Sequence, residues 1–188
     1  MRVNTKAYGP VDVDERQQIH FPAGILGFEN LKDYLLLDAA QPPFYWLQSL
    51  DVVEIAFVLI NPRIFRPDYT LEVDPAELDS LGITSEDQVL DFAIVTIPED
   101  PMEMTANLQG PIIINRATRV GRQTISTDPA RQVRHPILKE LATLGHDRFR
   151  QARSVIRLSV IYRQSDPSTS LKQSLVFVGG QYSRQRDQ

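Results

Sequence analysis

The chain has 188 residues, of which 42% are hydrophobic, and 24 acidic and 20 basic residues give it a formal net charge of −4. These values are ordinary for a globular protein, and the length predicts one domain or one domain with an appendage. The absence of cysteine excludes disulfides, cysteine zinc sites, thiol catalysis and iron–sulfur clusters. The longest apolar run, residues 55–60, is too short to span a membrane, and the polar first residues do not resemble a leader. We therefore expect a cytoplasmic protein.

The charge is unevenly distributed along the chain. Residues 1–127 contain 19 acidic and 9 basic residues, a net of −10, whereas residues 128–188 contain 5 acidic and 11 basic residues, a net of +6. An acidic body repels phosphate and attracts basic proteins, although a modest acidity is also ordinary for cytosolic proteins. The first 127 residues are therefore poor candidates for nucleic-acid binding.

Short runs of apolar residues, separated by turn residues, recur along the chain. They predict strands near residues 3–7, 11–13, 19–21, 34–37, 44–47, 55–60, 69–73, 89–97, 112–115 and 123–126. Such regular spacing is typical of a barrel or a sandwich, so we expect a mainly β fold.

One short helix and one further turn are predicted within this body. Asp74 is placed to cap the helix, Pro75 to occupy its first position, and Glu77 to complete a reciprocal capping box. Gly82 can end the helix in a left-handed conformation. A second single turn is predicted at residues 84–87.

The last third of the sequence changes character. Residues 136–153 show helical spacing of apolar residues, residues 156–163 alternate as in a strand, and residues 175–178 form a short apolar run. We expect either a helix-and-hairpin appendage or a poorly ordered tail, with a slight preference for the first.

The sequence contains no recognisable catalytic or metal-binding motif. The three histidines lie in separate segments without paired-ligand spacing, and no nucleophile elbow, phosphate-binding loop or calcium loop is present. Glu72 and Asp74 could share one face of a strand, but such carboxylates are usually solvated rather than catalytic. We therefore expect no enzyme activity, no catalytic or metal-binding residue and no cofactor.

Apolar and glycine-rich segments are more informative. In the segment 20–34, Gly24 and Gly27 permit positive φ, so Ile25, Leu26 and Phe28 could project outward, or could turn inward and plug a barrel end. The segments 42–50 and 61–74 add aromatic residues of the kind that anchor protein interfaces.

The ordered motifs of the first 138 residues resemble the flagellar assembly factor FliW family. They are HFPAGILGFE, PFYWLQS, NPRIFRPDY, LGITSEDQV, TANLQGPIIINR and RQTI. The resemblance covers residues 1–138, and the basic extension 139–188 has no recognised counterpart and no assigned role.

This resemblance implies a small antiparallel β-barrel-like domain and a non-enzymatic function. Members of the family bind CsrA, a dimeric translational repressor, and also flagellin, and the two partners compete. When flagellin is secreted, the freed FliW protein binds CsrA allosterically and relieves repression of flagellin synthesis. The resemblance thus implies CsrA and flagellin as partners. We also expect the protein to be monomeric, with no membrane contact and no direct binding to nucleic acid.

The candidate partner-binding residues lie in two of the motif segments. Exposed aromatic side chains ringed by polar groups are typical of interfaces, and the alternative for the aromatic residues is core packing. The candidates are Ile25, Phe28, Glu29, Phe65, Tyr69, Glu72 and Asp74. Asn107 and Gly110 are expected to set a turn.

A second hypothesis assigns nucleic-acid binding to the basic tail, through Arg148, Arg150, Arg153 and Arg157. Only Phe149 is available there for base stacking, and a solvated basic face is the simpler interpretation.

Overall fold

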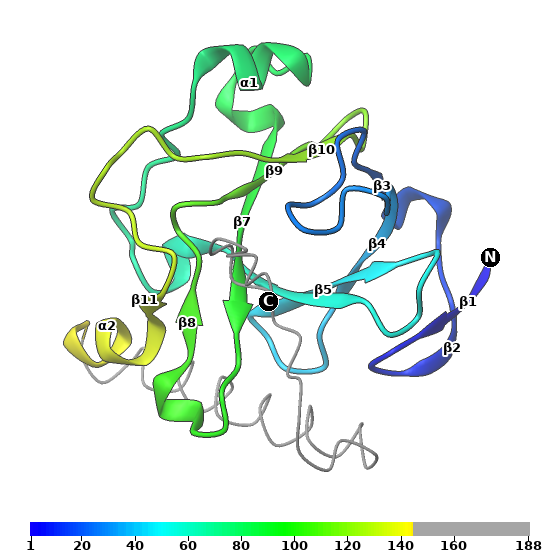
Figure 1. Cartoon of the computed structure of the whole chain (residues 1–188), viewed down its shortest axis with the longest axis horizontal. Coiled ribbons are helices and arrows are strands. Elements are labelled where there is room, and N and C mark those ends of the chain that lie inside the picture. Colours follow the sequence, from blue (N-terminus) through cyan, green and yellow to red (C-terminus); the bar gives the residue numbers. More distant parts are fainter. Residues whose placement is uncertain (145–188) are drawn as a thin grey trace, which may run out of the picture.

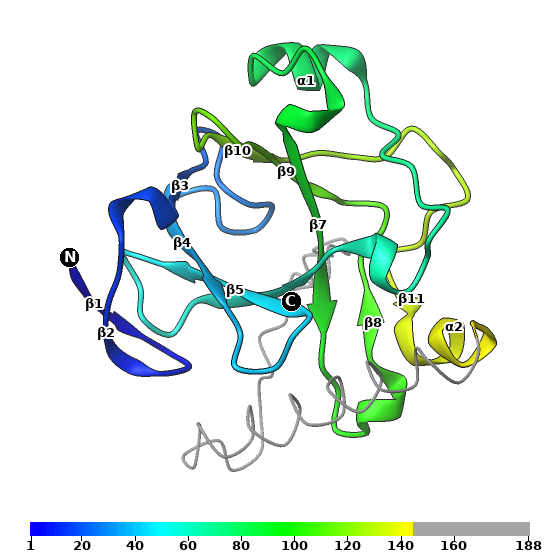
Figure 2. The same cartoon turned by 180° about the vertical axis from the view of Figure 1, so that it is seen from behind.

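The computed structural model describes residues 1–144. Antiparallel strands dominate the described chain, as the sequence predicts (Figures 1 and 2). The strands are β1 (Arg2–Thr5), β2 (Gly9–Asp12), β3 (Gln18–His20), β4 (Asp33–Asp38), β5 (Phe44–Ser49), β6 (Ala56–Ile60), β7 (Val89–Thr96), β8 (Thr105–Ala106), β9 (Ile112–Asn115), β10 (Gly121–Gln123) and β11 (His135–Pro136). The helices are α1 (Pro75–Ser80), α2 (Ile137–Thr143) and the single 3₁₀ turns η1 (Glu15–Gln17), η2 (Pro62–Ile64), η3 (Glu86–Gln88) and η4 (Pro101–Glu103).

The principal sheet curls into a barrel-like shape. Its strands follow the order β10-β9-β7-β6-β5-β4-β3, β8 pairs with the end of β7, and β11 pairs with β8. A single parallel bridge between His20 and Val120 joins the two edges, supported by a 2.9 Å bond from the His20 amide to the Arg119 carbonyl. β1 and β2 form a separate hairpin. The mainly antiparallel β fold expected from the sequence is confirmed.

The interior of the curled sheet is filled by alternate residues of its strands. The interior cluster contains Ile19, Phe21, Ile25, Tyr34, Leu47, Phe57, Leu59, Phe92, Ile94, Ile112 and Ile114. The aromatic rings meet edge to face, with 5.4 Å between the ring centres of Phe21 and Tyr34. Because these residues come from nearly every strand, this cluster fixes the curvature of the sheet.

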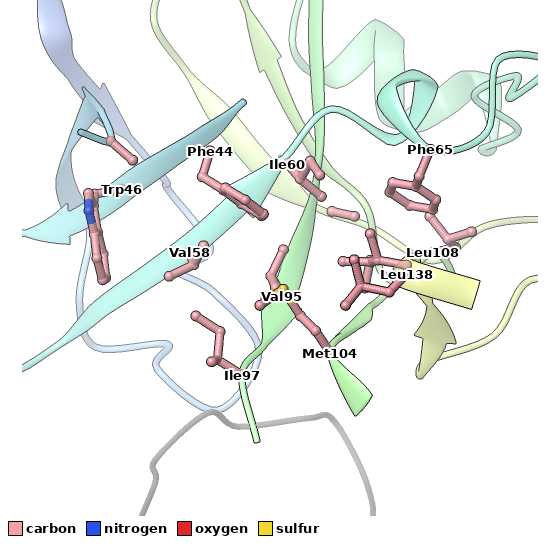
Figure 3. Close-up of a cluster of buried hydrophobic side chains, with 14 of the residues drawn as sticks. Phe44, Trp46, Val58, Ile60, Phe65, Val95, Ile97, Met104, Leu108 and Leu138 are labelled. Atoms are coloured by element: carbon pink, nitrogen blue, oxygen red, sulfur yellow. The ribbon is translucent and has the colours of Figure 1, made fainter. Parts of the chain in front are cut away.

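A second core covers the outer face of β4 to β7 (Figure 3). Trp46, Val58 and Val95 of the sheet belong to this second core, and so do Ile137, Leu138 and Leu141 of α2. Leu138 lies beside Phe65 and Leu108, at the opposite end of the core from Trp46 (Figure 3). The same strands therefore bury both faces, which explains why they read as continuous apolar runs rather than alternating ones. A smaller cluster of Leu81, Ile83 and Ile113 lies beneath α1.

The start and end of α1 follow the predicted signals, with one difference. The Asp74 carboxylate accepts a 2.9 Å bond from the Ala76 amide, and Gly82 adopts φ +66°. The expected capping box is not completed, because Glu77 pairs with Arg122 of β10 instead. A complete capping box occurs at η1, between Asp14 and Gln17.

Several predicted boundaries were wrong. Residues 69–73 form no strand, because the Glu72 carbonyl bonds to Ser126 and Thr127 and only Val73 makes an isolated bridge. The strand expected at 123–126 begins earlier, at Gly121. The helix expected over 136–153 is seen as α2, whereas its remainder and the runs at 156–163 and 175–178 lie outside the described residues.

Candidate functional site

The glycine-rich segment, residues 21–32, is a tightly hydrogen-bonded loop. Gly24 and Gly27 adopt φ values of +73° and +85°, as expected. A Cβ atom at Gly24 would lie 2.6 Å from the Glu29 Cα atom, so only glycine fits there. The Glu29 carboxylate accepts a 2.8 Å bond from the Gly27 amide, and this bond lowers the pKa of Glu29. The loop is therefore a rigid platform rather than a loose connection.

The loop divides its apolar side chains between the interior and the surface. Ile25 is buried in the interior cluster, and Phe28 is half-buried with its ring centre 5.2 Å from that of Phe57. Leu26 is 52% exposed. Of the two alternatives for these residues, inward packing holds for Ile25 and outward projection for Leu26.

Leu26 borders an apolar hollow of about 250 Å³. We define the apolar hollow by its lining residues Ile25, Leu26, Phe57, Ile94, Asn107, Gln109, Gly110, Gln123, Ile125 and Val133. Ile125, which also lines the apolar hollow, is 63% exposed. Exposed aliphatic side chains around a concave apolar floor are typical of a protein-binding surface.

Hydrogen bonds hold the rims of the apolar hollow together. The Gln123 side chain accepts a 3.0 Å bond from the Leu26 amide and donates a 3.2 Å bond to the Gly110 carbonyl. The Asn107 side chain accepts a 2.8 Å bond from the Gly110 amide, which confirms the predicted turn. Three segments far apart in sequence are thereby fixed around one surface.

A larger groove of about 930 Å³ lies beside the first half of β7. We call it the β7-edge groove, and its lining includes Tyr45, Arg63, Tyr69, Leu71, Asp79, Ile83, Glu86, Val89, Leu90, Asp91, Phe92 and Arg116. The Arg63 guanidinium donates bonds of 2.7 and 2.8 Å to the buried Asp91 carboxylate. This pair fixes η2 against β7.

Tyr69 lies at one end of the β7-edge groove, between two guanidinium groups. The Arg63 and Arg131 guanidinium carbons are 5.4 and 4.9 Å from the centre of its ring. Burial raises the pKa of Tyr69 to about 12, with a further contribution from Asp91. The phenol therefore stays neutral at physiological pH.

The remaining candidate residues of the second motif have local structural tasks. Phe65 is fully buried and stacks on His135, so the interpretation of Phe65 and Tyr69 as exposed anchors was wrong, and core packing is the alternative that holds. Glu72 is exposed and bonds to Thr70 and Arg131. The exposed Asp74 caps α1. The two carboxylates do not share a strand face.

Three residues of these two surfaces were not among the candidates predicted from the sequence. They are Ile125 of the apolar hollow and Arg63 and Asp91 of the β7-edge groove. Asp91 carried a usable signal, because an acid inside the apolar run VLDFAIVT needs a partner when it is buried. Ile125 carried none, because its exposure follows from the early end of β10.

Two kinds of site are absent from the described part of the chain. Within residues 1–144 no group of three or more His, Asp or Glu side chains is placed to hold a metal ion. None of the described helices has the length and apolar character needed to cross a bilayer. The arginines of the nucleic-acid hypothesis, from Arg148 to Arg157, lie outside the described residues.

Comparison with known proteins identifies the family to which the chain is similar. The model of the FliW protein family matches residues 2–137. Flagellar assembly factor FliW from Caldanaerobacter subterraneus subsp. tengcongensis is 45% identical over 143 residues, which cover 75% of this chain and 95% of that protein. Flagellar assembly factor FliW from Treponema denticola is 42% identical over 147 residues, covering 78% of this chain and 100% of that protein.

A solved structure agrees with these matches. The crystal structure of a flagellar assembly factor FliW superposes with a TM-score of 0.67 at 36% sequence identity, covering 73% of this chain and 96% of that one. The family match spans most of the described residues. It includes the loop 21–32 and the strands that surround the apolar hollow and the β7-edge groove. The chain belongs to the FliW family.

Proposed function

We propose that this protein is a non-enzymatic flagellar assembly factor that acts in the cytoplasm, binds CsrA and flagellin in competition, and antagonises CsrA allosterically. The observation that carries the proposal is the family match over residues 2–137, together with relatives of 40–45% identity that are each named flagellar assembly factor. In this role the protein couples flagellin synthesis to flagellin secretion.

The charge of the body supports a basic partner. Residues 1–127 have a net charge of −10, and the α1 region, residues 74–87, contains five acidic residues and no basic one. A repressor that holds messenger RNA presents basic surface, which such a body attracts. Bound beside the RNA path, the acidic body would also raise the energy of phosphate approach.

The apolar hollow supplies the short-range contact in this proposal. Leu26 and Ile125 are exposed on its rims, and Phe28 and Glu29 lie on the same loop as Leu26. Apolar anchors with polar neighbours are the usual centre of a protein interface. In this proposal the buried candidates have an indirect role, because their packing supports the partner-binding surface. They are Ile25, Phe65 and Tyr69.

The test is a competition experiment with purified protein, CsrA and a flagellin leader RNA. We expect the protein to release RNA from CsrA, and added flagellin to reverse that release. The double variant Leu26→Ala/Ile125→Ala should lose release, whereas Val53→Ala, at an exposed apolar residue outside the apolar hollow, should retain it. Equal melting temperatures would show that neither variant is unfolded.

Two results would contradict the proposal. RNA that stays on CsrA at every concentration of this protein would exclude antagonism. Direct binding of the labelled RNA to this protein alone, at physiological salt, would instead favour the nucleic-acid hypothesis for the basic tail.

A further inference from the structure

One segment beside the β7-edge groove uses only one of its two edges. The carbonyl of Thr70 accepts a 3.4 Å bond from the Arg131 guanidinium, and the carbonyl of Glu72 accepts a 2.9 Å bond from the Thr127 amide. Peptide groups alternate in direction along an extended chain, so those of Leu71, between these two carbonyls, point to the opposite side. In the described part of the chain, neither the amide nor the carbonyl of Leu71 makes a hydrogen bond.

The same segment forms one wall of the β7-edge groove. Tyr69, Thr70 and Leu71 line the groove, and so do Leu90 and Phe92 of β7. The bonded edge of the segment is covered by the chain that follows β10, which Figures 1 and 2 show beside the connection from η2 to α1. An extended molecule that enters the groove along this wall therefore meets the unpaired peptide groups of Leu71.

The lining of the β7-edge groove is rich in apolar and aromatic side chains. They are Tyr45, Leu71, Leu78, Ile83, Val89, Leu90 and Phe92. The volume of about 930 Å³ lies within the range of about 300–1,000 Å³ that is usual for ligand sites. An occupant must therefore contribute apolar side chains.

The charge beside this apolar lining is mainly negative. The ion pair between η2 and β7 adds no net charge. Two exposed lining carboxylates, those of Asp79 and Glu86, and one lining guanidinium, that of Arg116, form no ion pair among the described residues. Both carboxylates belong to the segment 74–87, which contains five acidic residues and no basic one. The potential at this wall therefore favours a positively charged occupant.

We propose that the β7-edge groove binds an extended segment of a partner protein in which apolar residues alternate with lysine or arginine. The apolar face of this segment packs on Leu90 and Phe92, and its basic side chains meet the carboxylates of Asp79 and Glu86 at the rim. Its backbone adds as a strand beside Leu71, whose peptide groups it pairs. The inference does not depend on the proposed function, which assigns its short-range contact to the apolar hollow.

Binding of a synthetic peptide to the full chain tests the proposal. The probe is a fluorescein-labelled seven-residue peptide in which lysine and valine alternate, and its binding is followed by fluorescence polarisation at physiological salt. We expect saturable binding of this peptide, and none of the matched peptide in which glutamate replaces lysine. Failure of the lysine peptide to bind at protein concentrations up to about 1 mM would overturn the proposal.

Two N-methylated versions of the peptide separate strand pairing from side-chain contact. Amides of alternate residues point to opposite sides of an extended peptide, so only one set can face Leu71. Methylation of the valine amides removes one set of donors, and methylation of the lysine amides removes the other. One methylated peptide should bind at least about tenfold more weakly, whereas the other should bind like the parent. Equal affinities of the two would exclude strand addition.

Two double charge reversals locate the site on the protein. Asp79→Lys/Glu86→Lys should weaken binding of the lysine peptide at least about tenfold. Asp12→Lys/Glu54→Lys makes the same change in net charge at exposed acids outside the groove and should have a much smaller effect. Equal melting temperatures would show that both variants are folded. An equal loss of binding in both would overturn the proposal, because the peptide would then respond only to the overall charge of the body.

Discussion

The side chain of Phe65 connects the segment that follows β6 with the helix α2. Its ring is fully buried, stacks on His135 with 5.8 Å between ring centres, and lies beside Leu138 of α2 and Leu108 (Figure 3). The connection that follows β6 is thereby held to α2. An aromatic residue in a motif segment is thus explained by packing, before any partner is considered.

Replacing Phe65 with alanine should therefore destabilise the protein severely. We expect Phe65→Ala to lower the free energy of unfolding by about 3–5 kcal/mol, because truncation of a fully buried ring leaves a cavity. Phe28→Ala, at a half-buried ring, should cost less and serves as the comparison. Urea unfolding followed by tryptophan fluorescence measures both. Unchanged stability of Phe65→Ala combined with lost partner binding would restore the interface interpretation.

At the scale of elements, the loop 21–32 and the end of α1 both depend on a glycine with positive φ. Gly24 has φ +73° and Gly82 has φ +66°, but only Gly24 is crowded. A Cβ atom at Gly24 would approach the backbone of Glu29, whereas one at Gly82 would meet nothing within 4 Å. A substitution at Gly82 therefore tests the cost of backbone strain alone, whereas a substitution at Gly24 tests backbone strain together with a steric clash.

Alanine at these two glycines should have unequal effects. Gly82→Ala should cost about 1–2 kcal/mol, the usual penalty for a left-handed non-glycine residue. Gly24→Ala should cost more, because the Glu29 backbone must also move, and it should displace Leu26 from the rim of the apolar hollow. Chemical unfolding of both variants and the wild type gives the comparison. Equal losses would mean that the loop is not as rigid as its hydrogen bonds indicate.

The elements differ in how well the sequence predicts them. β5, β6 and β7 were predicted closely because both faces are buried and the runs are continuously apolar. The segment 69–73 alternates like a strand, yet only Val73 is paired, because its partner Ser126 makes a single bridge and the chain then bends at Thr127. Leu26 and Ile125 line the same hollow, where the Gln123 side chain links three segments that are distant in sequence. Contacts of this kind have no local signal, so the apolar hollow could not be predicted.

At the scale of the whole molecule, charge is separated along the chain. The first 127 residues have a net charge of −10 and the remaining 61 a net charge of +6. If acidic and basic residues were evenly mixed along the chain, residues 1–127 would produce only a weak long-range electrostatic potential. The observed separation of charge instead leaves these residues with a strongly negative net charge. Association with a basic partner is therefore expected to have a strong electrostatic component.

Binding to CsrA should weaken as salt is added. Between about 0.1 M and about 1 M salt the Debye length falls from about 10 Å to about 3 Å, which screens the attraction between the acidic body and a basic partner. Calorimetry or surface binding at both salt concentrations measures the effect, which should be mostly a slower association. An affinity that does not change with salt would limit the interaction to apolar contacts.

The covering of the sheet on both faces also determines how variants of this protein should be sought. Most positions in β5, β6 and β7 are buried, so random mutagenesis of the whole gene would yield mainly folding defects from these strands. A library confined to exposed positions of the connections, such as those around Leu26 and Ile125, would change recognition while sparing the scaffold. The architecture thus separates the positions that encode folding from those that are free to encode partner choice.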